Sequence, residues 1–183
     1  MAGLGDLVSR RLVDSGSKNV IRAAWDSLSR VPGGKVAFSR GIGLAAPYTA
    51  TIDAHVEALE PGRSEVTMRD RRAVRNHLRC VHAVALANLV ELAGNVAVAY
   101  TLPDDGRFIV SGMSLEYLKK ARGTLRAFGQ CPEVLGTIAP SGAEQMIDKR
   151  EIEVRVRVLD DAGDDVVLGT LKTLIGPKKR PVG

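Results

Sequence analysis

The stretch from Val81 to Tyr100 constrains the fold of this chain most, because it is long, apolar and helical in its spacing. Alanine, valine and leucine occur on nearly every side of the expected helix, which covers about residues 79–100 and ends before Pro103. A helix that is apolar almost all round has to be surrounded by other parts of the protein. Its length equals that of a membrane span, but four polar residues that lipid would not tolerate interrupt it, namely His82, Asn88, Glu91 and Asn95. We therefore expect a buried central helix and no membrane association.

Segments on both sides of this helix alternate between apolar and polar residues, as half-buried strands do. The segments 50–58 and 64–70 flank the turn-forming residues EPGR at 60–63, which predicts a β-hairpin. Four further extended segments follow the helix, at about residues 107–118, 122–131, 149–159 and 165–175. The pattern predicts an α+β domain in which an antiparallel sheet of about six strands wraps around one long central helix.

The ends of the chain have a different pattern from its centre. Residues 4 to about 30 have apolar side chains at helical spacing, and VPGGK at 31–35 ends that pattern. We expect an N-terminal helical extension over residues 1–32, the main domain over 33–176 and a basic C-terminal tail over 177–183. The N-terminus lacks the apolar core of a secretory signal, and two cysteines are too few for a disulfide framework or a zinc site. These features favour a cytoplasmic protein.

The chain is basic, with a formal net charge of +5 and a pI near 9.5. The densest basic stretch, Arg69–Arg79, has no interleaved aromatic residues to stack on bases and does not resemble a recognition helix. We expect no nucleic-acid partner. The basic residues form either solvated surface or a rim that attracts a phosphorylated small molecule.

Three polar residues of the central helix share one side of it. Asn88, Glu91 and Asn95 are spaced i, i+3 and i+7 and form a narrow stripe, whereas His82 lies on the opposite side and roughly 13–14 Å from Glu91 along the axis. A site that uses both His82 and Glu91 therefore needs a second copy of the chain, as in an isologous dimer with antiparallel helices. Alternatively, the stripe is the solvent side of the helix or a satisfied polar seam. His77 and His82 do not share a helical face, which argues against a metal site.

The segment NHLRCVHAVALANLVE resembles the core motif of hotdog-fold thioesterases related to the phenylacetate-degradation thioesterases. Their pattern is Asn, five residues, His-Gly-Gly and an acid nine residues after the His; here Asn76, His82 and Glu91 have this spacing. RFIVSGMSLEYLKKARGTLRAFG is similar to the next two strands of that family, and PYTATIDAHVEALEPGRSEVTMRDRRAVRNH to the preceding hairpin of an uncharacterised branch. The likeness covers about residues 35–175 and implies the hotdog fold.

The resemblance implies an acyl-CoA thioesterase that acts as a homodimer or a dimer of dimers, with no cofactor beyond the CoA of its substrate and no metal. In that assignment the backbone N–H of Ala83 polarises the thioester carbonyl, Asn76 holds the carbonyl or the attacking water, and His82 orients the turn. Glu91 of the partner subunit is the general base or the nucleophile. The expected substrate-binding residues are Asn88, Val84, Lys119, Lys120 and Arg122, the last three of which meet the CoA phosphates or are merely solvated.

Three positions depart from the pattern of the family. Ala83 and Val84 replace its two glycines, and Val110 occupies a position where Ser or Thr is frequent. These departures favour a second hypothesis, a hotdog protein that binds an acyl group or acyl-CoA without catalysis. A third hypothesis, a hydratase, lacks its Asp–His signature, because Asp70 is followed five residues later by Arg75.

Overall fold

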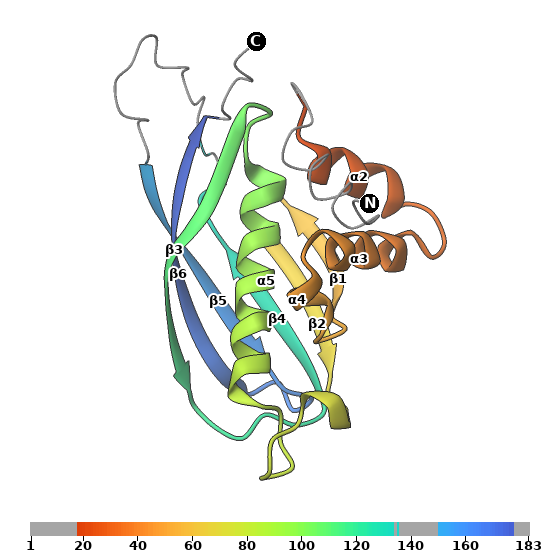
Figure 1. The fold of residues 1–183 in the computed structure, drawn as a ribbon, viewed down its shortest axis with the longest axis vertical. Coiled ribbons are helices and arrows are strands. Elements are labelled where there is room, and N and C mark those ends of the chain that lie inside the picture. The colour runs from red at the N-terminus through yellow and green to blue at the C-terminus, as the bar shows by residue number, and fades with distance from the viewer. Residues whose placement is uncertain (1–17, 134, 136–149, 178–183) are drawn as a thin grey trace, which may run out of the picture.

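A six-stranded antiparallel sheet wraps around one long helix, α5 (Ala83–Thr101), in the computed structural model, which describes residues 18–133, 135 and 150–177 (Figure 1). The spatial order of the strands is β1-β2-β4-β5-β6-β3. Their bounds are β1 His55–Glu60, β2 Arg63–Arg69, β3 Gly106–Tyr117, β4 Thr124–Gln130, β5 Arg150–Leu159 and β6 Asp165–Pro177. The predicted α+β architecture is thus confirmed, and the last four strands agree with their predicted ranges within three residues.

The EPGR hairpin is also confirmed, because Glu60 pairs with Arg63 and Gly62 adopts the left-handed conformation that the turn requires, with φ 76°. The first strand, however, begins at His55 and not at residue 50. The apparent alternation over residues 50–54 is misleading, since Asp53 has a φ of 51°, which no strand accommodates.

Among the described residues, three helices precede the sheet and lie beside β1 and α5 (Figure 1). Helix α2 (Val20–Leu28) falls within the predicted N-terminal helical region, the first part of which lies outside the described residues. Helices α3 (Gly34–Ala45) and α4 (Pro47–Ala50) were not predicted. An aromatic contact holds α2 against α3. The rings of Trp25 and Phe38 meet edge to face with centroids 5.0 Å apart, and both side chains are buried.

The last turn of α5 is capped from a distant part of the chain. Asn19 Nδ2 donates hydrogen bonds to the carbonyl oxygens of Ala99, at 2.7 Å, and Leu102, at 2.9 Å. Arg22 Nε donates to the Tyr100 carbonyl oxygen at 2.9 Å. The same Asn19 side chain caps the start of α2 by accepting from Arg22 N at 2.9 Å. Two residues thereby satisfy backbone groups at the ends of two helices.

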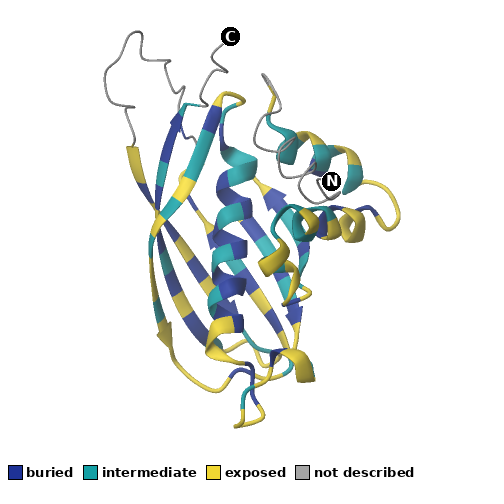
Figure 2. Cartoon of the chain, viewed as in Figure 1, coloured by how far each residue is buried: buried dark blue, intermediate teal, exposed yellow. Residues whose placement is uncertain are grey.

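Eleven residues of α5 are buried, and Figure 2 shows buried residues along the length of the helix. Among the described residues, α5 is the helix long and apolar enough to cross a membrane by length and composition. Its burial against the sheet identifies it instead as a core helix. Close packing depends on Gly129 of β4, where an added Cβ would lie 2.5 Å from the Ala93 carbonyl oxygen and 2.6 Å from Ser64 Oγ. Ser64 Oγ in turn donates to that carbonyl at 2.6 Å.

Substituting Gly129→Ala is expected to destabilise the protein by about 1–3 kcal/mol, because the backbone of α5 must shift to admit the methyl group. Gly41→Ala is the matched control, since Gly41 lies within α3 and a Cβ there meets nothing within 4 Å. The control is expected to be stabilising by about 0.5–1 kcal/mol, the usual gain of Ala over Gly inside a helix. Urea unfolding of the two variants measures both effects, and equal stabilities would contradict the packing argument.

Candidate functional site

The loop before α5 is held together by Asn76. Its Oδ1 accepts from Leu78 N at 2.9 Å and lies 3.4 Å from both Cys80 N and Cys80 Sγ, while its backbone N donates to the Cys80 carbonyl oxygen at 2.9 Å. Arg79, at the tip, has a φ of 55°. The Asn76 Nδ2 group makes no hydrogen bond with any described residue. The loop therefore fixes this amide as a donor available to a ligand.

Helix α5 begins at Ala83, four residues later than predicted, because His82 is its N-cap. His82 has extended backbone angles, its backbone N donates to the Val74 carbonyl oxygen at 2.8 Å, and its Nδ1 accepts from Val84 N at 3.1 Å. An Nδ1 that accepts assigns the ring proton of the neutral tautomer to Nε2. His82 thus caps the first turn of α5.

The Ala83 N–H is the first amide of α5 and makes no hydrogen bond with the described residues. It lies where the partial positive charge of the helix dipole is greatest. Tyr117 of β3 donates its hydroxyl hydrogen to the Ala83 carbonyl oxygen at 3.2 Å and so fixes the same turn from the sheet. The sequence analysis did not assign a role to Tyr117; its place in the family-like segment EYLKKARG was the available signal.

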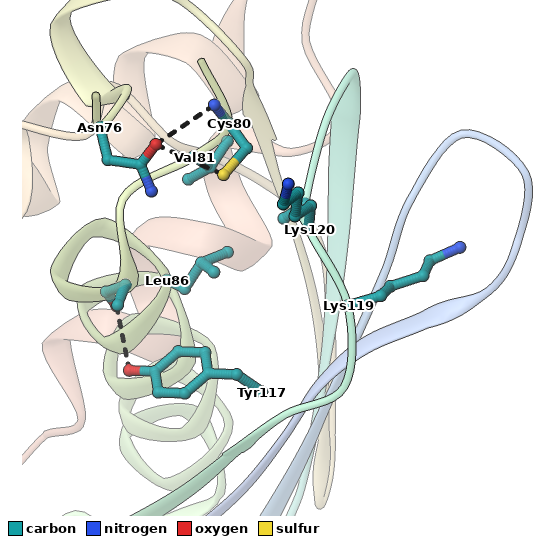
Figure 3. Close-up of a pocket in the computed structure, with 9 residues that line it drawn as sticks. Asn76, Cys80, Val81, Leu86, Tyr117, Lys119 and Lys120 are labelled. Carbon is teal, nitrogen blue, oxygen red and sulfur yellow. Dashed lines mark hydrogen bonds between the residues drawn. The ribbon is translucent and has the colours of Figure 1, made fainter. Parts of the chain in front are cut away.

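A cavity of about 330 Å³ lies beside this turn (Figure 3). It is lined by Asn76, Cys80, Val81, Ala83, Leu86, Tyr117, Lys119, Lys120 and Ala121. The structure thus brings together four of the predicted site residues at one mostly apolar hollow, namely Asn76, Ala83, Lys119 and Lys120.

The two neighbouring lysines differ in their surroundings. Lys119 Nζ lies 2.8 Å from Asp160 Oδ2 and 2.5 Å from Asp164 Oδ2, and its side chain points away from the cavity (Figure 3). Its hydrogen bond to Asp160 raises the pKa of Lys119, and the same bond lowers the pKa of Asp160. Lys120 and Arg122 are exposed and make no ion pair with the described residues. These two cations therefore remain available to an anionic ligand.

Glu91 lies away from this cavity. It is eight residues beyond Ala83, roughly 12 Å along the helix axis, and it lines neither of the cavities that flank the first turn. Its partly exposed carboxylate makes no hydrogen bond or ion pair with the described residues. Within one chain, Glu91 therefore lies apart from Asn76 and Ala83, which belong to the same predicted site.

Glu91 faces the open side of the fold. Strand β3 is an edge of the sheet over 12 residues, and its side chains next to α5 include Met113 and Tyr117, which are 45% and 47% exposed. Val84, at the same face of α5, is 52% exposed. An apolar surface of this kind beside an unpaired strand edge is typical of a protein interface.

The other predicted residues of α5 lie at a second cavity beside its first two turns. Asn88 is buried, and its Nδ2 donates to the Tyr48 carbonyl oxygen of α4 at 3.2 Å. Asn88, Val84 and His82 line a second cavity of about 200 Å³. No group of three His, Cys, Asp or Glu side chains suited to a metal ion occurs in the described part of the chain.

The sequence profile of the domain of unknown function DUF4442 matches residues 34–175. A crystal structure titled genomics APC5556 is 31% identical, with a TM-score of 0.68, and the match covers 86% of this chain and 98% of that one. The thioesterase HI1161 from Haemophilus influenzae has a TM-score of 0.60 at 11% identity, covering 74% of this chain and 87% of that chain. PA5026 from Pseudomonas aeruginosa, titled a probable thioesterase, has a TM-score of 0.62 at 18% identity, with coverages of 80% and 97%.

A search of curated proteins found no significant match. The likeness to the thioesterase structures confirms the hotdog fold predicted from the sequence. A match to a domain of unknown function agrees with the predicted uncharacterised branch.

Proposed function

Because this chain belongs to the DUF4442 family and has a thioesterase-like hotdog fold, we propose that it hydrolyses an acyl-CoA thioester to a free acid and CoA. The observation that carries the proposal is the unbonded Ala83 N–H at the start of α5, beside the fixed Asn76 amide and a mostly apolar cavity. Two residues with free donors that line one cavity suit the oxygen of a thioester carbonyl, which gains negative charge when its carbon is attacked. The helix dipole adds to that stabilisation.

The acid of the proposed site comes from a second copy of the chain. Ala87 is partly exposed, has a small side chain and lies midway between Ala83 and Glu91 on α5. Two antiparallel helices that cross near Ala87 therefore bring Ala83 of one protomer beside the partner's Glu91, and by symmetry create two equal sites. The open edge of β3 favours the same arrangement, because pairing two such edges satisfies their backbone groups.

In this dimer the partner's Glu91 removes a proton from the attacking water, or attacks the carbonyl carbon itself. The C–S bond then breaks, and CoA leaves as its thiol after taking up a proton. If Glu91 attacked the carbon itself, the mixed anhydride that remains is hydrolysed by water, which releases the free acid and restores the carboxylate. Lys120 and Arg122 supply the positive charge for the CoA phosphates, and the net charge of +5 favours the approach of an anionic substrate. We assign Lys119 mainly to the turn after β5, since two aspartates already neutralise it. A cytoplasmic location and association into a dimer of dimers accompany this proposal.

The second candidate function is binding of an acyl-CoA or acyl group without hydrolysis. The exposed Val84 favours it, because a branched side chain beside the Ala83 N–H narrows the approach of a thioester. A fixed donor pair and an apolar cavity serve binding as well as they serve catalysis.

Release of CoA from a panel of short, long and aromatic acyl-CoAs tests the proposal directly. We expect hydrolysis of at least one class by a protein that light scattering shows to be a dimer or tetramer. Saturable binding of acyl-CoA without release of CoA would support the second candidate. Hydrolysis by a strictly monomeric protein would contradict the shared site.

A further inference from the structure

The second cavity, of about 200 Å³, lies between α4 and the first two turns of α5. It is lined by α5 residues His82, Val84, Ala85 and Asn88, whereas the cavity beside Lys120 is lined by Ala83 and Leu86. At 100° per residue, these two sets lie on nearly opposite sides of the helix. The first turn of α5 therefore lies between two hollows, one lined in part by lysines and one bordered by Tyr48 of α4 and by residues 51–52 and 73–75.

Asn88 contributes a buried polar atom to this second cavity. The side chain is only 5% exposed, and its Nδ2 donates to the Tyr48 carbonyl oxygen. A carbonyl oxygen can only accept, which fixes the orientation of the amide and directs Oδ1 away from Tyr48. Oδ1 accepts no hydrogen bond from the described residues. It is also not among the unpartnered polar atoms that are fully buried, so it remains accessible. It is an acceptor open to whatever occupies the cavity.

The surroundings limit the chemistry of that occupant. The walls near Asn88 include the apolar side chains of Ile52, Val74 and Ala85. An anionic group would face the Asn88 oxygen, which has no proton to give, and the cation of Arg75, which also lines the cavity, is already paired with Asp70 at 2.6 Å. An ammonium group would lie close to that same cation. A neutral donor on an aliphatic chain, namely a hydroxyl group, satisfies both conditions.

We propose that this cavity holds the tail of a short hydroxylated acyl group, whose hydroxyl donates to Asn88 Oδ1 while CoA lies on the Lys120 side. This inference rests on the proposed function and names its substrate class. Asn88 is five residues beyond Ala83, roughly 7.5 Å along the helix axis, a distance that an extended six-carbon acyl chain spans. The volume agrees with a short chain, since drug-sized ligands occupy roughly 300–1,000 Å³.

The test compares kcat/KM for CoA release from 6-hydroxyhexanoyl-CoA and hexanoyl-CoA. We expect the hydroxylated substrate to be preferred about ten-fold, as one buried hydrogen bond allows. Asn88→Leu keeps the number and branching of the side-chain heavy atoms but removes the acceptor, and it is expected to abolish or invert the preference. The ratio is independent of the fraction of folded protein, so a loss of stability in this variant does not affect it. An unchanged ratio in Asn88→Leu would overturn the inference.

Ala85→Val is the matched control, because it narrows the same cavity without touching the amide. It is expected to lower kcat/KM for both substrates and leave their ratio unchanged. Failure of the proposed function is recognised separately, as an absence of CoA release from every acyl-CoA. In that case calorimetry with 6-hydroxyhexanoate and hexanoate tests the cavity without catalysis: tighter binding of the hydroxy acid that Asn88→Leu removes supports the inference, and equal or no binding overturns it.

Discussion

Replacing Glu91 with Gln is expected to lower kcat/KM for CoA release by about two to four orders of magnitude, the usual contribution of a general base. Glutamine has the same shape but neither accepts the proton of water nor attacks a carbonyl carbon. Glu91 makes no hydrogen bond or ion pair with the described residues of its own chain, so the fold should be little affected. Stopped CoA-release assays and urea unfolding of the same preparations separate a loss of activity from a loss of stability.

Glu151→Gln is the control for this substitution. Glu151 is an exposed carboxylate of β5 that lacks an ion pair among the described residues, and its side chain lies on the face opposite to the buried Ile152. It should retain full activity. A Glu91→Gln protein as active as the Glu151→Gln protein would exclude Glu91 as the catalytic acid.

Replacing Ala83 with Pro is expected to reduce kcat by about 10²–10³-fold, the cost of losing one donor to an oxyanion. Proline has no backbone N–H, and it is well tolerated at the first position of a helix, where that group has no partner within the helix. The residue before a proline must be extended, and His82 already is, with φ −67° and ψ 140°. The substitution thus replaces the amide hydrogen with a methylene of the proline ring and leaves the helix intact.

Ala83→Gly, which keeps the N–H, should remain active and is the control for Ala83→Pro. Circular dichroism of both variants should show an unchanged helix content. Full activity in Ala83→Pro would mean that this amide does not contact the reacting carbonyl.

The two inactive variants also test whether the site is shared. A heterodimer of Glu91→Gln and Ala83→Pro chains contains one site with an intact Ala83 N–H and an intact Glu91, and one site that lacks both. Refolding an equal mixture should therefore restore about a quarter of the wild-type activity if subunits pair at random. A site within one chain would give no restoration.

The sequence predicted the strands and the central helix well because their patterns are regular. Val154, Val156 and Val158 of β5 are all buried, as strict alternation requires. The helices α3 and α4 were missed for a physical reason. Helix α3 contains three glycines, which are weak helix formers, and much of its stability comes from packing of Phe38 against Trp25, a contact that local sequence does not reveal.

The candidate site was predicted in part for similar reasons. The spacing of Asn76, His82 and Glu91 is local and can be read from the chain. The capping role of His82 depends on a bond to Val74 across the loop, and the role of Tyr117 depends on a contact 34 residues away. The orientation of Asn88 depends on α4, which the sequence did not predict. Long-range contacts therefore determine the roles and orientations of site residues that local sequence patterns do not specify.

The capping of α5 by Asn19 and Arg22 has a consequence for the order of folding. Residues separated by 78–83 positions in the sequence meet at the last turn of α5, so the chain must close a long loop before these bonds form. During synthesis the N-terminal helix leaves the ribosome well before its acceptors exist. The start of α5, in contrast, is capped by His82 beside it and can form at once. The first turn of the helix thus begins to form from neighbouring residues, and the opposite end is secured only when residues 99–102 have emerged as well.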